Sequence, residues 1–232
     1  MNHNLLEAKE TLILSPHPDD EALGCSGTIM LLNKAGASST VVFLTEGERL
    51  YGEPDHIVGE KRRQEGYRAS VMLGCKEAMF LGFPDGDVNA YAEGVYRMLY
   101  EIIEKKKPDT IFSPSLIDYH QDHIATAKIA LRLLSSLHSF KLAFYEVYET
   151  IRFNQLIDIS EFIHDKERII MNYKRSLYDK PELYVHASLG LNAQRSIFTQ
   201  NKGYYEAFLV VDQPIDAERI YDWSCYRSDD LS

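Results

Sequence analysis

Residues 12–21 read Leu-Ile-Leu-Ser-Pro-His-Pro-Asp-Asp-Glu, so a short apolar run is followed at once by a histidine and three carboxylates. The apolar run predicts a buried strand that ends where the polar residues begin. Imidazole and carboxylate groups are good ligands for Zn²⁺ and similar divalent metals. A further carboxylate beside such ligands could act as a general base on a water molecule. This stretch therefore predicts a metal site at the end of a buried strand.

A second polar cluster has the same relation to the strand before it. The residues His120-Gln121-Asp122-His123 follow the apolar run Thr110-Ile111-Phe112. Positions 120 and 123 are three apart, so on a helical turn both side chains face the same side. The two clusters together predict one metal site that is built from distant parts of the chain.

Predicted strands and helices alternate along the first two thirds of the chain. The expected strands span residues 12–15, 41–45, 78–81, 110–113 and 142–148, and the expected helices span 21–33, 60–73, 91–106 and 124–137. Strands separated by helices of this length are typical of βαβ units. In the last third we expect a helix at 160–177 and a late strand at 203–211. The predicted fold is α/β and Rossmann-like, with a mainly parallel sheet flanked by helices and a C-terminal elaboration, in a single domain over residues 1–232.

Polar loops follow the first four predicted strands, at residues 17–20, 45–48, 84–87 and 113–123. In open parallel sheets, ligands bind outside the carboxyl ends of the strands, so these loops should share one crevice. A dinucleotide would need a glycine-rich phosphate loop after the first strand. The carboxylates at that turn would repel a pyrophosphate, which argues against this class of ligand.

Composition narrows the range of partners. The chain has 232 residues, a net charge of −10 and three scattered cysteines. The acidic balance argues against nucleic acid, and the single basic run at 105–107 fits the end of a helix. The sequence shows no membrane span and no secretory signal, and the cysteines offer neither a disulfide framework nor a thiolate zinc site. We expect a cytoplasmic protein.

The two clusters together resemble the PIG-L or LmbE-like family of zinc-dependent N-acetylglucosaminyl deacetylases. The resemblance rests on Pro16-His17-Pro18-Asp19-Asp20-Glu21 together with His120-Gln121-Asp122-His123, and it extends over nearly the whole chain. Residues 45–48, Arg62 and residues 205–208 take part in it. Gln121 departs from the pattern, because many relatives carry proline there.

The resemblance implies a role for each matching residue. His17, Asp20 and His123 match the metal ligands, which would hold Zn²⁺ or another divalent metal. Asp19 matches the general base, and His120 matches the residue that stabilises the developing oxyanion, where a cationic imidazole would be suitable.

Further residues have implied or open roles. Asp122 is expected to orient either His17 or His120, or to cap the following helix. Arg62 and Asp85 match positions near the substrate, and Asp118 replaces a tyrosine that lies near the substrate in some relatives. Glu21 is expected to be a helix charge or a partner of a ligand. Four other histidines lack a supporting cluster: His56, His138, His164 and His186.

The predicted reaction is the removal of the N-acetyl group from an acetylated amino sugar, a GlcNAc-type conjugate. Two alternatives remain: a metallohydrolase acting on another N-acyl amide, such as one with a longer acyl chain, and a metal-dependent sugar-binding protein without catalysis. The expected partner is a small amino-sugar conjugate, and related enzymes suggest that the chain could form homo-oligomers.

Overall fold

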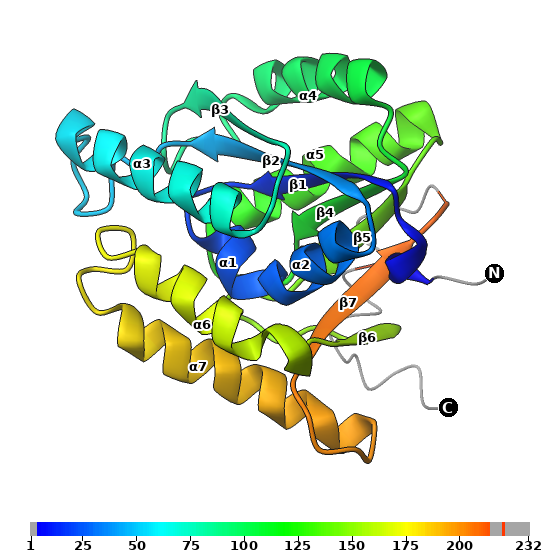
Figure 1. Ribbon diagram of the computed structural model, residues 1–232. Coiled ribbons are helices and arrows are strands. Elements are labelled where there is room, and N and C mark those ends of the chain that lie inside the picture. Colours follow the sequence, from blue (N-terminus) through cyan, green and yellow to red (C-terminus); the bar gives the residue numbers. More distant parts are fainter. Residues whose placement is uncertain (1–3, 214–219, 221–232) are drawn as a thin grey trace, which may run out of the picture.

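One seven-stranded sheet forms the centre of the computed structural model, which describes residues 4–213 and residue 220 (Figure 1). Its strands lie in the order β3-β2-β1-β4-β5-β7-β6. Their bounds are β1 Glu10–Ser15, β2 Ser38–Thr45, β3 Glu77–Phe83, β4 Thr110–Pro114, β5 Lys141–Tyr145, β6 Gln155–Asp158 and β7 Tyr205–Val211. Strands β1 to β5 are parallel, whereas β7 is antiparallel to both β5 and β6. This confirms the predicted α/β fold with a mainly parallel sheet.

Helices cover both faces of the sheet. Their bounds are α1 Asp20–Gly24, α2 Ser26–Lys34, α3 His56–Met72, α4 Ala92–Lys106, α5 Gln121–Leu137, α6 Ile163–Asn172 and α7 Pro181–Gln194. Helices α4 and α5 pack on one face, and the remaining helices pack on the other (Figure 1). The inner strands β1, β2, β4 and β5 are buried on both faces, which is why they read as continuous apolar runs in the sequence, whereas the edge strands β3 and β6 are only partly buried.

The predicted helix at 21–33 is two helices, because the chain breaks at Cys25 between α1 and α2. Gly24 lies so close to β5 that a Cβ atom there would be 2.2 Å from Cδ2 of Tyr145. The buried carboxylate of Glu206, on β7, accepts hydrogen bonds from the backbone amides of Gly27 and Thr28 at 3.0 and 2.8 Å. A distant carboxylate thus caps α2, and no local sequence signal reveals it.

The C-terminal third differs most from the prediction. The expected helix at 160–177 becomes a short 3₁₀ turn (Ser160–Phe162) and α6, and it ends at Asn172. The chain leaves the helix at Tyr173, whose ψ of 59° is not helical. The expected strand at 203–211 is β7, whereas β6 and α7 were not predicted.

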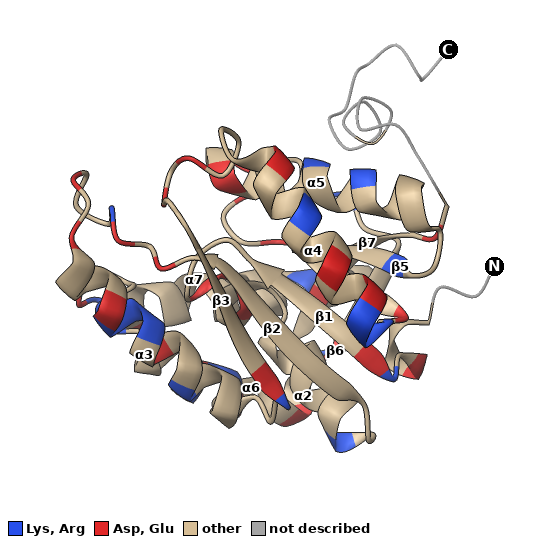
Figure 2. Cartoon of the chain, turned by 90° about the horizontal axis from the view of Figure 1, so that it is seen from above, with Lys and Arg blue, Asp and Glu red and all other residues tan. Residues whose placement is uncertain are grey.

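Charged residues of both signs are interspersed on the outer helices. Figure 2 shows Lys and Arg alternating with Asp and Glu along α3 and α4. The basic run at 105–107 closes α4, where Lys107 adopts a left-handed φ of 51°. Within the described ranges 4–213 and 220, none of the helices is both long and apolar enough to cross a bilayer.

Candidate metal centre and active site

A hollow of about 320 Å³ lies at the carboxyl ends of the parallel strands. Each of the first four strands contributes lining residues from the loop that follows it, as the polar loops predicted. The lining residues are His17, Asp19, Arg49, Leu50, Gly52, Arg62, Asp85, Gly86, Tyr119, His120, Gln121, Tyr148, Ser176, Tyr178 and Tyr184.

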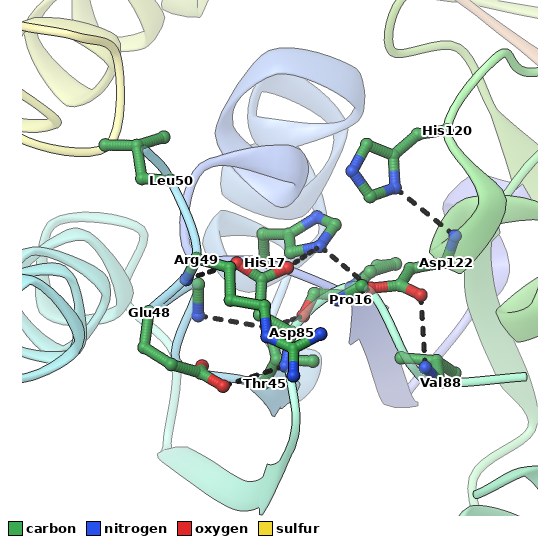
Figure 3. Close-up of polar contacts among 12 residues, drawn as sticks. Pro16, His17, Thr45, Glu48, Arg49, Leu50, Asp85, Val88, His120 and Asp122 are labelled. Carbon is green, nitrogen blue, oxygen red and sulfur yellow. Dashed lines mark hydrogen bonds and ion pairs between the residues drawn. The ribbon is translucent and has the colours of Figure 1, made fainter. Parts of the chain in front are cut away.

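His17 follows β1 and is held by carboxylates on both ring nitrogens; Figure 3 labels two of these carboxylates, Asp85 and Asp122. Its Nδ1 lies 3.2 Å from Oδ2 of Asp20. Its Nε2 lies 3.1 Å from Oδ1 of Asp85 and 3.3 Å from Oδ2 of Asp122. Of the roles considered for the Asp122 carboxylate, contact with His17 is the one that the structure shows.

Asp122 also connects two loops at this edge of the sheet. Its carboxylate accepts hydrogen bonds from the backbone amides of Gly86 and Val88, at 2.7 and 3.1 Å. Because it is completely buried, this carboxylate holds the loop after β3 and the ring of His17 in a fixed relation.

His123 lies in the first turn of α5, completely buried, and it also faces two carboxylates. Its Nε2 is 3.2 Å from Oδ1 of Asp20, and its Nδ1 is 3.1 Å from Oδ2 of Asp118. The carboxylate of Asp20 therefore lies between the rings of His17 and His123. A second carboxylate behind a metal-binding histidine fixes the ring and raises its basicity, and Asp118 is placed to do so.

The donor atoms around Asp20 are suited to a metal ion. Oδ1 of Asp20 and both ring nitrogens of His123 are buried without an aligned hydrogen bond, although all lie near polar atoms. Unpaired buried polar atoms are costly, and a cation bound between Oδ1 of Asp20 and Nε2 of His123 would give both atoms a partner. Donor atoms of His17, His120 and His123 also lie within 4.8 Å of one another. The residues present thus fit a divalent metal with imidazole and carboxylate ligands.

Electrostatics favour a positive charge at this position. Burial would lower the pKa of His17, but contacts with Asp122, Asp20 and Asp85 raise it well above its ordinary value. Burial would also lower the pKa of His123, but the charge of Asp20 and the contact with Asp118 raise it to about 9. The pKa of Asp20 is held well below its usual range because His123 and His17 outweigh its burial. A cluster that attracts protons this strongly attracts a metal cation for the same reason.

Asp19 occupies a strained turn between β1 and α1. Its φ of 137° is one that side-chain-bearing residues rarely adopt, and such strain costs about 1–3 kcal/mol and is concentrated at functional sites. Its Oδ2 is 3.3 Å from Nη2 of Arg62. Burial raises the pKa of Asp19 well above its ordinary value, against the opposing charge of Arg62.

Arg62 extends from α3 to the same turn and is buried. Its Nη1 donates to the carbonyl oxygen of Gly47 at 2.9 Å, and its Nε donates to Oγ of Ser176 at 3.2 Å. A Cβ atom at Gly47, whose φ is 66°, would lie 2.1 Å from Nη1. The glycine in the loop after β2 is therefore required for the approach of Arg62.

His120 caps the N-terminus of α5 and lines the hollow. Its Nδ1 accepts a hydrogen bond of 3.2 Å from the backbone amide of Asp122 (Figure 3). Burial lowers its pKa, and the neighbouring His17 and His123 lower it further. We expected a cationic imidazole, whereas this environment favours the neutral one. In the neutral ring, acceptance at Nδ1 places the proton on Nε2, which remains a donor.

Two further predicted residues, Asp85 and Glu21, lie at different distances from the metal centre: Asp85 lines the hollow, and Glu21 does not. Asp85 is buried, its Oδ2 accepts from the amide of Arg49 at 2.9 Å, and contact with His17 lowers its pKa to about 2 despite its burial. Glu21 is buried against Tyr173 and Ser15, and burial raises its pKa to about 7. Glu21 thus packs behind the ligand loop, as expected of a partner residue.

The histidines predicted to be unrelated to the site join no donor cluster in the part of the chain that the structure describes: His56, His138, His164 and His186. Four tyrosines that the sequence analysis did not assign do line the hollow: Tyr119, Tyr148, Tyr178 and Tyr184. Tyr119 lies in the polar loop predicted at 113–123, and the sequence analysis gives the other three no role in the site.

Comparison with known proteins agrees with this geometry. The profile of the PIG-L family, described as GlcNAc-PI de-N-acetylase, matches residues 12–134. The chain belongs to the PIG-L family. Over 196 residues it is 26% identical to a diacetylchitobiose deacetylase of Thermococcus kodakarensis, an alignment that covers 75% of this chain and 72% of that protein.

Solved structures share the fold. The N,N'-diacetylchitobiose deacetylase of Pyrococcus horikoshii superposes with a TM-score of 0.75 at 23% identity, over 91% of this chain and 86% of that one. GalB of Pseudomonas putida, a 4-carboxy-2-hydroxymuconate hydratase, gives the same TM-score at 22% identity, over 90% of this chain and 98% of that one. Likeness at this level shows the fold alone, so the reaction has to be argued from the residues of the site.

Proposed function

We propose that this PIG-L family member is a zinc-dependent hydrolase that removes the N-acetyl group from an acetylated amino sugar of the GlcNAc-conjugate type. The observation that carries the proposal is the buried carboxylate of Asp20 between His17 and His123, with Asp19 beside it in a strained turn. A binding site without catalysis has no need of an additional buried carboxylate. Membership of a family described as a de-N-acetylase supports the same reaction.

His17, Asp20 and His123 would hold the metal. Zinc, when bound, would polarise the acetamide carbonyl and lower the pKa of the attacking water. The carboxylates of Asp122 and Asp118 contact the opposite ring nitrogens of the two histidines and would keep both rings oriented. Another divalent metal would suit the same donors.

The chain's own groups account for the proton transfers. Asp19 would accept a proton from water as its oxygen attacks the acetamide carbon, and the high pKa that burial gives Asp19 makes it a stronger base. The Nε2–H of a neutral His120 would donate a hydrogen bond to the developing oxyanion. The carbon–nitrogen bond then breaks, acetate leaves, and Asp19 or His120 returns a proton to the amine.

Substrate recognition is proposed for Arg62, Asp85 and Asp118. All three are buried and each contacts other groups of the protein: Arg62 contacts Asp19, Asp85 contacts His17, and Asp118 contacts His123. Arg62 and Asp85 line the hollow and could reach a sugar hydroxyl from there. We further propose a single domain over 1–232, a cytoplasmic location and homo-oligomers.

Acetate release provides the test. The metal-stripped chain should be inactive on a panel of N-acetylated amino sugars and glycosides, and Zn²⁺ should restore acetate release from at least one of them. Release from N-acetyl amides that lack a sugar would instead favour a metallohydrolase for another amide. Tight sugar binding without acetate release, in a fully zinc-loaded chain, would favour a binding protein.

A further inference from the structure

A second hollow adjoins the metal centre. It encloses about 510 Å³ between α1, α7 and the loop that follows β5. Three tyrosines, Tyr119, Tyr148 and Tyr184, line both this hollow and the one at the metal centre. The ring of Tyr148 is also stacked on that of His123, with the ring centroids 5.7 Å apart. The second hollow therefore begins beside a predicted metal ligand.

The walls of the second hollow are mainly apolar. Leu23, Val147, Leu183 and Leu191 contribute aliphatic groups. The side chain of Leu183 is 60% exposed, which is unusual for a leucine in a concave site. Such hollows are typical binding sites for apolar groups of small molecules.

The two buried polar side chains of this hollow, Glu146 and Asn192, already have partners within the protein. The carboxylate of Glu146 is paired with Arg195 and accepts from the amide of Ile151 at 2.8 Å. Asn192 is buried and donates to the carbonyl oxygen of Tyr205 at 3.0 Å, and its Oδ1 is itself buried. The metal-centre hollow, by contrast, is lined by Arg49, Arg62, Asp85 and Gln121.

The difference in polarity between the two hollows implies an orientation for a bound amide. A secondary amide is planar and trans, so its amine substituent and its acyl substituent extend away from each other. Sugar hydroxyls match the polar hollow, where arginine and aspartate can bind them. With the carbonyl at the metal donors, the acyl substituent then extends past the tyrosines toward the apolar hollow.

We infer that the second hollow holds the acyl group, and that the preferred substrate is an amino sugar whose N-acyl group is a medium-length alkyl chain longer than acetyl. This inference rests on the proposed function. The reaction is the same hydrolysis: water oxygen bonds to the acyl carbon, the carbon–nitrogen bond breaks, the acyl group leaves as a carboxylate, and the amine receives a proton. Burial of each added pair of methylene groups should strengthen binding about tenfold.

The test uses the zinc-loaded full chain and three methyl glycosides of glucosamine, carrying N-acetyl, N-butyryl or N-octanoyl groups. An octyl glycoside of N-acetylglucosamine places the same alkyl chain on the other end of the molecule. Ala187, on α7, lines the hollow, and Ala187→Trp should fill it. His186→Trp alters the neighbouring exposed position, which does not line the hollow, and serves as the matched control.

We expect kcat/KM of the unaltered chain to rise about tenfold from N-acetyl to N-butyryl, which adds two methylene groups, and to rise further with N-octanoyl. Ala187→Trp should remove that gain and leave the N-acetyl value within about twofold, and His186→Trp should change neither. Hydrolysis of N-acetyl with no gain for N-octanoyl would overturn the inference and leave the proposed function intact. A gain confined to the octyl glycoside and lost in Ala187→Trp would assign the hollow to the aglycone, against the inference. Absence of hydrolysis for every substrate would refute both proposals.

Discussion

The two sides of the site differ in both origin and chemistry. The metal centre is built from the loops after the parallel strands, inside residues 12–134 that match the family profile. Its key side chains are buried, and each makes two or more polar contacts within the protein. The apolar hollow takes much of its wall from α7 and the loop after β5, outside that match, and exposes Leu183 and Tyr119.

This difference indicates how function is divided in the chain. Buried carboxylate–histidine contacts tolerate little change, because a partner left unpaired in the interior costs several kcal/mol. An exposed apolar wall can change its size and shape at small cost. We therefore expect the metal centre to determine the reaction and the C-terminal wall to determine which substrate is accepted.

Loss of a metal ligand should have the largest effect on the metal centre. His17→Ala, Asp20→Ala and His123→Ala should each lose tightly bound zinc and nearly all activity, because each removes one of three protein donors. Elemental analysis and acetate release provide the measurements, with His186→Ala on the exposed face of α7 as the control. Full zinc occupancy in all three variants would show that the ligands have been wrongly assigned.

A smaller loss separates the base from the ligands. Asp19→Asn should keep the zinc and the fold but lower kcat by about two to four orders of magnitude, the usual range for a positioned general base. Zinc content, circular dichroism and kcat should be measured on the same preparation. Normal turnover in a zinc-loaded variant would exclude Asp19 from the reaction.

Much of the metal centre could be predicted from the sequence. The apolar runs give β1 to β5, and the polar residues directly after them identify His17, Asp20 and His123 as neighbours. Local patterns suffice here because the carboxyl ends of parallel strands always meet at one edge. The break between α1 and α2 was missed because the residue that caps α2, Glu206, is 178 positions from Thr28.

The wall of the apolar hollow could not be predicted from the sequence, because no local sequence pattern marks the residues that form it. Helix α7 has apolar residues on more than one face, since it packs on the core and also lines a hollow, so its periodicity is weak. Asp118 reads as a loop carboxylate that could reach a sugar, and only the fold brings it to Nδ1 of His123. Its position behind a predicted ligand leads to a separate prediction.

Asp118→Asn should weaken zinc binding about 10- to 100-fold, the usual effect of removing a carboxylate behind a metal-bound histidine. Competition with a chelator of known affinity measures the change. Asp87→Asn is the matched control, because Asp87 is at the same edge of the sheet but pairs with Arg49. Unchanged zinc affinity with a raised KM would support the direct sugar contact that the sequence suggested.

The smallest expected change concerns the pH dependence that Arg62 imposes on Asp19. If Asp19 is the base, it must be ionised, so kcat/KM should fall as pH decreases through its pKa. Burial raises that pKa and the Arg62 charge lowers it. Removing the charge in Arg62→Gln should therefore raise the pKa of Asp19 and move the acid limb of the kcat/KM profile to higher pH. Arg63→Gln, which removes a neighbouring arginine paired with Glu46 on the surface, should leave the limb in place. An equal shift in both variants would indicate a general charge effect, and a raised KM with an unmoved limb would mean that Arg62 acts on the substrate alone.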